Sequence, residues 1–304
     1  MKDKILDLFY LSSFNIFRWF IYLAPTFLKY PIIKGVARLA YLVDIKHRRI
    51  AKVNLDLAYE NSLSDEEKKS IIKKCYENMA FNLADFVENQ GISKDRLLLK
   101  VEFKNSKIVE DAKKDGKPII FMTAHYGNWE LLALAIAAKF GSLSIVGRPL
   151  DSKVMDEILK RNREQFDIEL IPKKGAMRPL IKALKDGRFV GLLVDQNTTD
   201  SEGVLIDFFG KKARHTPAVA ILAKRMNAII IPTFIQTDDH TIYTISFYTP
   251  LKMKDSGNKD QEILENVQAQ ANITEQIIRQ KPNEWFWFHR RWKNQYKHKY
   301  EEVV

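Results

Sequence analysis

From about Val101 onward, short apolar runs alternate with helical patterns of roughly 10–15 residues, and this alternation decides the fold class. Strands are predicted over residues 118–123, 143–146, 168–171, 189–194 and 228–234, and helices over residues 129–140, 153–166, 176–185, 218–226 and 261–279. This order predicts an α/β fold with a mainly parallel sheet flanked by helices. The segment Thr241–Tyr248 alternates polar and apolar residues, which indicates an antiparallel partner strand.

The first hundred residues predict helices only. Residues 33–60 form one predicted helix whose basic face carries Lys46, His47, Arg48, Arg49 and Lys52. Ser64 and Glu67 have the spacing of a capping box, which predicts a helix from there to about Asn89. The lone cysteine, Cys75, lies in that helix, and we expect it to be a small buried side chain.

The N-terminal segment over residues 5–28 is rich in aromatic and aliphatic residues. Asp7 and Arg18 interrupt it, so its longest uncharged runs, Leu8–Phe17 and Trp19–Leu28, have ten residues each, whereas a membrane span needs about 20. Its polar residues recur at three- and four-residue steps and form a narrow stripe: Lys4, Asp7, Asn15, Arg18, Tyr22, Thr26 and Lys29. This favours a helix at a membrane surface, with the stripe toward water or the protein body. Burial in the protein core is the alternative.

We therefore divide the chain into a membrane-associated amphipathic helix over residues 1–30 and a domain over residues 31–304. Within that domain, residues 31–100 are helical and residues 101–304 form the α/β core. The net charge of +11 predicts an anionic partner. We find no RNP motif, Cys/His finger or basic recognition helix, and therefore expect no nucleic-acid partner.

The segment Trp285–Lys293 interleaves aromatic and basic residues. Between Arg279 and Lys299 there are seven Lys and Arg residues against one acid, Glu284. Indole rings and guanidinium groups together suit anionic lipid headgroups. Stacking on a nucleic acid is one alternative, and a helix that packs its aromatics on the sheet while its cations stay in water is another.

His125 directly follows the predicted strand 118–123, and Glu130 lies five residues later. An imidazole oriented by a carboxylate forms a general base at neutral pH, and we expect Glu130 to hold the second ring nitrogen. Arg148 and Asp195 follow two other predicted strands. Because carboxyl ends of parallel strands meet at one edge of a sheet, the three ends are expected to converge. His215 is a rival base, although its basic surroundings favour a solvated loop.

The remaining candidates have less specific interpretations. Arg148 could bind a phosphate, steady an oxyanion, or form a salt bridge with Asp195. Asp195 and Gln196 could orient a basic group or form a simple turn, and Phe208–Gly210 is expected to shape a pocket. We expect solvent to surround the other histidines, His47, His240, His289 and His298, and no two histidines have zinc-ligand spacing. Because no Gly-x-Ser-x-Gly elbow is present, we expect direct transfer to a substrate hydroxyl without an acyl-enzyme.

Taken together, the motifs resemble one family over nearly the whole chain. His125-Tyr-Gly-Asn-Trp-Glu130 resembles the HX4(D/E) box of glycerolipid and lysophospholipid acyltransferases. The wider set resembles the late acyltransferases of bacterial lipid A biosynthesis, the lauroyl/myristoyl acyltransferase family: the apolar N-terminal helix, Arg49 with Asn54-Leu55, Arg148-Pro149, Asp195-Gln196, Phe208-Phe209-Gly210 with Thr216-Pro217, and Pro282 to Lys293.

This resemblance implies that an acyl chain moves from acyl carrier protein to a hydroxyl on an acyl chain of the Kdo-modified lipid A precursor. It implies no cofactor and no metal, with His125 as base and Glu130 as its orienting acid. Arg148, Asp195, Asn128 and Gln196 become substrate-binding candidates. The expected place is the cytoplasmic face of the cell inner membrane, monotopic or single-pass, against anionic lipids. An acyl-CoA-dependent acyltransferase of another glycolipid or phospholipid is the alternative.

Overall fold

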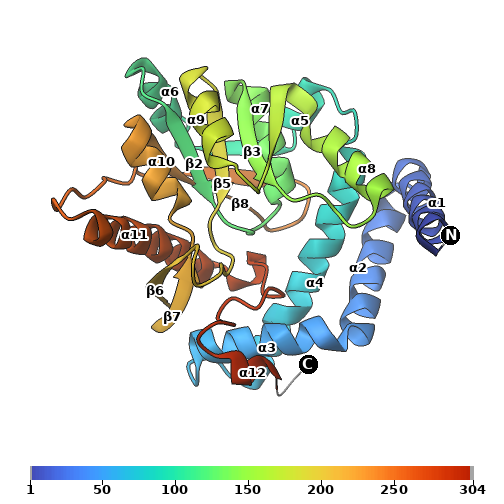
Figure 1. Ribbon diagram of the computed structural model, residues 1–304. Coiled ribbons are helices and arrows are strands. Elements are labelled where there is room, and N and C mark those ends of the chain that lie inside the picture. Colours follow the sequence, from blue (N-terminus) through green and yellow to red (C-terminus); the bar gives the residue numbers. More distant parts are fainter. Residues whose placement is uncertain (1, 302–304) are drawn as a thin grey trace.

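A seven-stranded sheet in the order β1-β9-β8-β2-β5-β3-β4 forms the centre of the molecule (Figure 1). The computed structural model describes residues 2–301, apart from the side chains of residues 2–6, 9 and 26. The strands are β1 (Val101–Lys104), β2 (Ile119–Thr123), β3 (Leu143–Gly147), β4 (Ile168–Pro172), β5 (Phe189–Leu193), β8 (Ile229–Thr237) and β9 (Tyr243–Phe247). Neighbouring strands are parallel except β8 and β9. The predicted mainly parallel sheet and its antiparallel strand are confirmed.

Helices cover both faces of the sheet, as the alternation of elements predicts. β2 is buried along its whole length: Ile119 and Phe121 pack with one layer of helices, and Ile120 and Met122 with the other. The first layer holds α5 (Lys94–Leu98), α6 (Lys107–Lys114) and α7 (Trp129–Phe140); the second holds α9 (Met177–Lys185), α10 (Ala218–Met226) and α11 (Lys259–Gln280). Because α7 follows β2 after only five residues, the loop between them is held in place from both ends.

Four helices precede the sheet: α1 (Lys2–Leu23), α2 (Thr26–Val43), α3 (Ile45–Tyr59) and α4 (Asp65–Glu88). The predicted capping box of Ser64 and Glu67 opens α4 and is confirmed. The sequence predicts one continuous helix over residues 5–28 and another over residues 33–60. Both predictions are wrong, because α1 ends at Leu23 and α2 ends at Val43. Pro25 lacks an N–H and disfavours helical backbone in the residue before it, which ends α1. The Asp44 carboxylate accepts the backbone N–H of His47 and starts α3.

A small antiparallel hairpin, β6 (Val204–Phe208) and β7 (Lys211–His215), stands apart from the main sheet. Phe209 and Gly210 form its turn with φ of 55° and 69°, the left-handed backbone that two-residue hairpin turns favour. The solvated loop predicted around His215 is therefore wrong. Phe208 and Phe209 do not shape an open pocket, because both are buried among aromatic rings.

The C-terminal segment, residues 282–301, runs through the protein interior. Trp285, Trp287 and Trp292 are buried, and Trp287 and Trp292 each pack edge to face against Trp285. The segment forms only two short helices, η2 (Pro282–Glu284) and α12 (Lys297–Glu301), and its aromatic part is neither a lipid-headgroup surface nor a helix on the sheet. The Asn54 amide in α3 fixes it by donating to two of its backbone carbonyl groups, 2.6 and 2.7 Å away.

Candidate functional site

His125 and Asp195 meet at the carboxyl ends of two neighbouring strands. β2 and β5 pair in parallel, so the residues that follow them lie side by side. His125 Nδ1 lies 2.9 Å from Asp195 Oδ1, and the backbone N–H of His125 donates to the same oxygen at 3.0 Å. The predicted convergence of these two strand ends is confirmed, and Asp195 orients the histidine.

Asp195 is 2% exposed, and three N–H groups hold its carboxylate. The third is the indole of Trp285, whose Nε1 donates to Oδ2 at 2.8 Å. Burial opposes ionisation, but the attraction of His125 and the bonds from His125 and Trp285 outweigh it, so the pKa of Asp195 is held well below its usual range. An ionised Asp195 can only accept, so His125 Nδ1 carries its proton and Nε2 presents a lone pair.

The second ring nitrogen of His125, Nε2, makes no bond to Asp195 and lies next to Gln196. The His125 side chain is 23% exposed, and Gln196 Nε2 lies 3.2 Å from His125 Nε2. The rings of Trp129 and Phe286 flank the imidazole, with centroids 5.3 and 6.3 Å away. The Gln196 amide can therefore donate to the base nitrogen until a substrate hydroxyl replaces it.

Glu130 does not orient His125, contrary to our prediction. Its two carboxylate oxygens bind the Arg163 guanidinium in α8 (Lys153–Arg163), with Arg163 Nε 2.9 Å from Oε2 and Nη2 2.5 Å from Oε1. The predicted contact fails because Asp195 already occupies His125 Nδ1. Arg163 is a site residue that sequence reasoning missed, since nothing near position 163 distinguishes it from the other basic residues of that helix.

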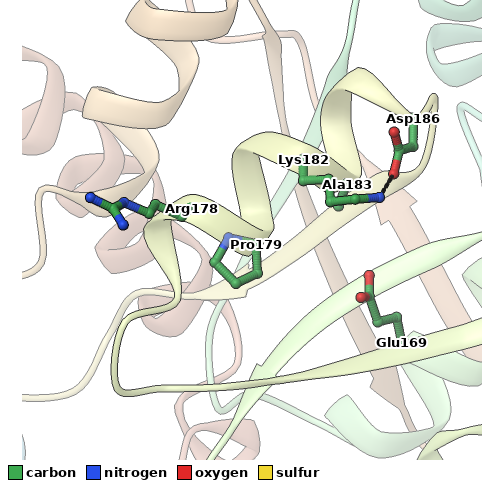
Figure 2. A pocket seen from close by; sticks show the side chains of 6 residues that line it. All are labelled: Glu169, Arg178, Pro179, Lys182, Ala183 and Asp186. Carbon is green, nitrogen blue, oxygen red and sulfur yellow. Dashed lines mark hydrogen bonds and ion pairs between the residues drawn. The ribbon is translucent and has the colours of Figure 1, made fainter.

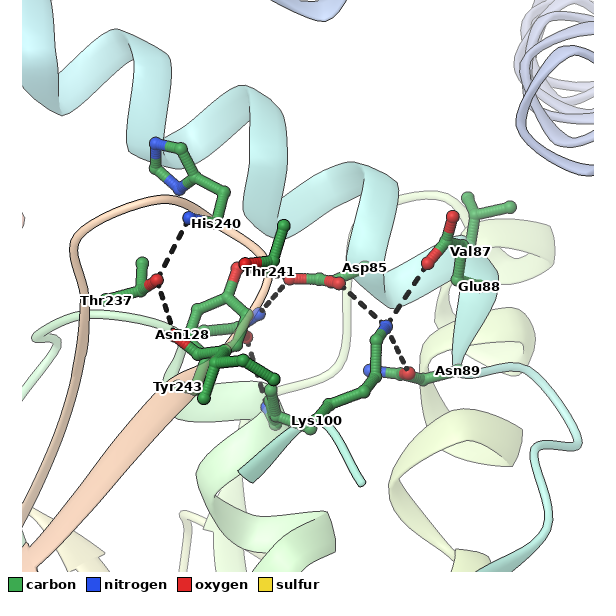
Figure 3. A network of polar contacts seen from close by, with 12 residues as sticks. Asp85, Val87, Glu88, Asn89, Lys100, Asn128, Thr237, His240, Thr241 and Tyr243 are labelled. Carbon is green, nitrogen blue, oxygen red and sulfur yellow. Dashed lines mark hydrogen bonds and ion pairs between the residues drawn. The ribbon is translucent and has the colours of Figure 1, made fainter. Parts of the chain in front are cut away.

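Asn128 belongs to a buried polar network behind the site (Figure 3). Its carbonyl oxygen caps α7 by accepting the Leu131 N–H at 3.1 Å, and its amide donates to Asp85 at 3.0 Å. Asp85 also binds Lys100, 2.9 Å away, and Tyr243. Because its amide and its carbonyl oxygen both bond within the protein, Asn128 positions the loop; the substrate contact stays a prediction.

Arg148 lies at the same edge of the sheet but does not reach Asp195. It directly follows β3, which pairs with β5 on the side away from β2. Its side chain is exposed and has no ion pair with any residue that the structure describes. The predicted salt bridge with Asp195 is therefore wrong, whereas a phosphate-binding role stays a prediction.

Three histidines predicted to face solvent are enclosed instead. His215 is fully buried, its Nδ1 lies 3.1 Å from Arg291 Nη2, and burial lowers its pKa to about 3. The His240 ring stacks on Phe81 with centroids 4.0 Å apart. His289 accepts the backbone N–H of Asn197 at 3.1 Å. By contrast, His47 and His298 are exposed, as predicted.

A separate pocket of ≈ 280 Å³ lies between α9 and the edge strand β4 (Figure 2). It is lined by Glu169, Arg178, Pro179, Lys182, Ala183 and Asp186. Charged side chains dominate its wall, and neither His125 nor Asp195 contributes to it. It therefore plays no part in the site built at the ends of β2 and β5.

Comparison with known proteins shows the family of this chain. The family model described as "Bacterial lipid A biosynthesis acyltransferase" matches residues 2–294. The chain belongs to this family. It is 22% identical over 219 residues to the lipid A biosynthesis myristoyltransferase of Escherichia coli (strain K12), which covers 72% of this chain and 68% of that protein. The lipid A biosynthesis lauroyltransferase of the same strain is 22% identical over 274 residues, 88% of this chain and 87% of that protein.

A phosphatidylinositol mannoside acyltransferase of Mycobacterium tuberculosis is 28% identical over 122 residues, which is 39% of this chain and 38% of that protein. The protein is therefore an acyltransferase of the lipid A biosynthesis family.

Proposed function

We propose that this acyltransferase moves a fatty acyl chain from acyl carrier protein to a hydroxyl on an acyl chain of the Kdo-modified lipid A precursor. The observation that carries the proposal is the pair of His125 and Asp195, held at 2.9 Å in a chain of this family. The reaction needs no cofactor, because the donor thioester is already activated and His125 supplies the base.

The proposed chemistry follows from the state of the imidazole. His125 Nε2 takes the proton of the acceptor hydroxyl while the hydroxyl oxygen attacks the carbonyl carbon of the donor thioester. Asp195 stabilises the imidazolium that forms. The tetrahedral intermediate then expels the carrier's thiolate, which receives the proton from His125 Nε2. An ester has formed, a thioester has broken, and the histidine is neutral again.

Direct transfer agrees with the groups around the site. Cys75 is buried, and burial raises the pKa of its thiol, so it is not a nucleophile at neutral pH. Its Sγ donates to the carbonyl group of Asn283, 3.3 Å away. The substrate therefore brings its own hydroxyl, and no acyl-enzyme is required.

Attachment to the membrane is proposed for the outer face of α1 and α2. Ile16, Trp19, Leu23 and Phe27 are exposed there, and Phe27 is 73% exposed. Part of the polar stripe of α1 contacts the protein body, one of the two orientations predicted for it: Asp7 accepts from Ser152 at 2.6 Å, and the Tyr22 hydroxyl donates to the Val87 carbonyl group at 3.2 Å. A helix that turns its polar residues to the protein and its apolar residues outward suits a lipid surface. None of the helices between residues 2 and 301 has the length and hydrophobicity of a membrane span.

The donor is proposed to be acyl carrier protein. That carrier is acidic, and this chain carries a complementary net charge of +11. Arg148 and Lys173 are exposed at the carboxyl ends of β3 and β4, at the sheet edge that holds His125. An acyl-CoA donor with another glycolipid or phospholipid acceptor is the alternative, and the similarity to the mannoside acyltransferase supports only its acceptor.

The test is a transfer assay with the purified full-length protein in mixed micelles, offering acyl carrier protein and acyl-CoA donors in competition. We expect transfer from the carrier protein to the Kdo-modified precursor. His125→Ala should abolish transfer, whereas His298→Ala, at an exposed position, should not. Preference for acyl-CoA would establish the alternative, and full transfer by His125→Ala would contradict the role of the base.

A further inference from the structure

The Trp285 indole connects the C-terminal segment to the catalytic pair. Trp285 is 3% exposed, and its Nε1 donates to Asp195 Oδ2 at 2.8 Å. The same segment holds the histidine loop through its backbone: Phe286 N donates to the His125 carbonyl oxygen at 2.9 Å, and Tyr126 forms a β-bridge with Trp285. One element therefore touches both members of the pair.

The two oxygens of Asp195 have different partners. Oδ1 accepts both N–H groups of His125, whereas Oδ2 accepts only from Trp285 among the residues that the structure describes. A buried carboxylate oxygen without a donor loses much of its stabilisation. The indole therefore satisfies Oδ2 and prevents the carboxylate from rotating Oδ1 away from the imidazole.

We propose that Trp285 is a positioning residue of this acyltransferase, which fixes Asp195 so that His125 keeps the tautomer and orientation of a general base. The proposal rests on the proposed function. The indole N–H, not the bulk of the ring, carries the effect. Replacement by Phe removes the N–H and leaves an aromatic ring, and replacement by His leaves a smaller ring that keeps an N–H.

Trp292 provides a matched control. It is as deeply buried as Trp285, and their ring centroids lie 6.3 Å apart. Its buried Nε1 has no hydrogen-bond partner among the residues that the structure describes. Trp292→Phe thus removes a buried indole N–H from the same cluster, but one that does not bond to Asp195. This variant reports the effect of replacing a buried Trp by Phe on packing alone.

The experiment compares kcat, KM and the pH profile of transfer for Trp285→Phe, Trp285→His and Trp292→Phe. We expect Trp285→Phe to lower kcat on the order of tenfold, the loss of one bond to a charged group, with an unchanged KM. With one donor fewer, Asp195 directs more of its charge to His125 and favours the imidazolium, so the acidic limb should move to higher pH. Trp285→His should be more active than Trp285→Phe, and Trp292→Phe should keep the wild-type limb.

Three results would overturn the inference: a wild-type profile for Trp285→Phe, an equal effect in Trp292→Phe, or Trp285→His less active than Trp285→Phe. Should Trp285→Phe not fold, Trp285→His decides alone. An acidic limb of the pH profile like that of the wild type supports the inference, and a shifted limb overturns it. A wild-type chain that transfers no acyl group from either donor would instead contradict the proposed function.

Discussion

Asp195 Oδ1 accepts two hydrogen bonds from His125, one from the ring at 2.9 Å and one from the backbone at 3.0 Å. Orientation of the ring and of the loop that carries it therefore depends on the same oxygen. Asp195→Asn should lower kcat roughly a thousandfold, because an amide can no longer stabilise the imidazolium. Steady-state kinetics with Asp186→Asn, on the surface of the protein, as the control should separate this loss from a general effect of the substitution.

The Glu130–Arg163 pair should stabilise the loop between β2 and α7. Both side chains are about four-fifths buried, so removing one partner leaves a charge without compensation. Arg163→Met should lower the free energy of unfolding by about 3 kcal/mol. Arg161→Met, in an exposed pair with Glu157 on the same helix, should cost less than about 0.5 kcal/mol. Equal losses in urea unfolding would contradict this role.

Gly127 should tolerate no side chain. Its φ is +60°, and a Cβ there would fall on the backbone carbonyl group of Ile235. Gly127→Ala should cost roughly 3 kcal/mol or more and abolish transfer, because the His125 loop must move. Gly116, with φ +66° and open space around it, is the control, and Gly116→Ala should cost only about 1 kcal/mol. Thermal unfolding of both variants makes the comparison, and similar melting temperatures would refute it.

His240 should make folding sensitive to mild acid. Burial lowers its pKa in the folded protein to about 4, against 6.5 in an unfolded chain. Between these values only the unfolded chain binds the proton of His240. This one group therefore lowers the free energy of unfolding as the pH falls from 6.5 to 4, by about 1.4 kcal/mol per pH unit. His240→Phe, which keeps the stack on Phe81, should flatten this part of the stability profile. An unchanged slope of stability against pH in His240→Phe, or an equal flattening in His298→Phe, would count against the role of His240.

The outer face of α1 and α2 should bind lipid. Ile16→Glu with Phe27→Glu should release the protein from anionic vesicles, because two charges must then enter the interface. Leu99→Glu, at a position 78% exposed after α5, should leave binding unchanged. Vesicle sedimentation measures this, and tight binding by the double variant would move the membrane contact elsewhere.

Local chemistry explains what could be predicted from the sequence. Helix α7 spans Trp129–Phe140 as predicted, because Asn128 caps its start and Gly141 follows its end. His125 and Asp195 could be placed together because each directly follows a buried strand and β2 and β5 are neighbours. These features depend on a few adjacent residues and on the rule that parallel strands share an edge.

Long-range contacts explain the failures. Arg163 and Glu130 are 33 residues apart, and Trp285 and Asp195 are 90 apart, so no local pattern indicates either pair. Aromatic and basic residues of the C-terminal segment have the composition of a lipid interface and of a core alike. Only tertiary packing decided that its three tryptophans lie inside.

The most direct measurement of the central claim is mass spectrometry of lipid A from cells that lack this gene and are complemented with the wild type, His125→Ala or His298→Ala. The account predicts that the wild type and His298→Ala restore one acyl chain to lipid A, and that His125→Ala does not. Lipid A of identical mass in all strains, or full restoration by His125→Ala, would contradict it.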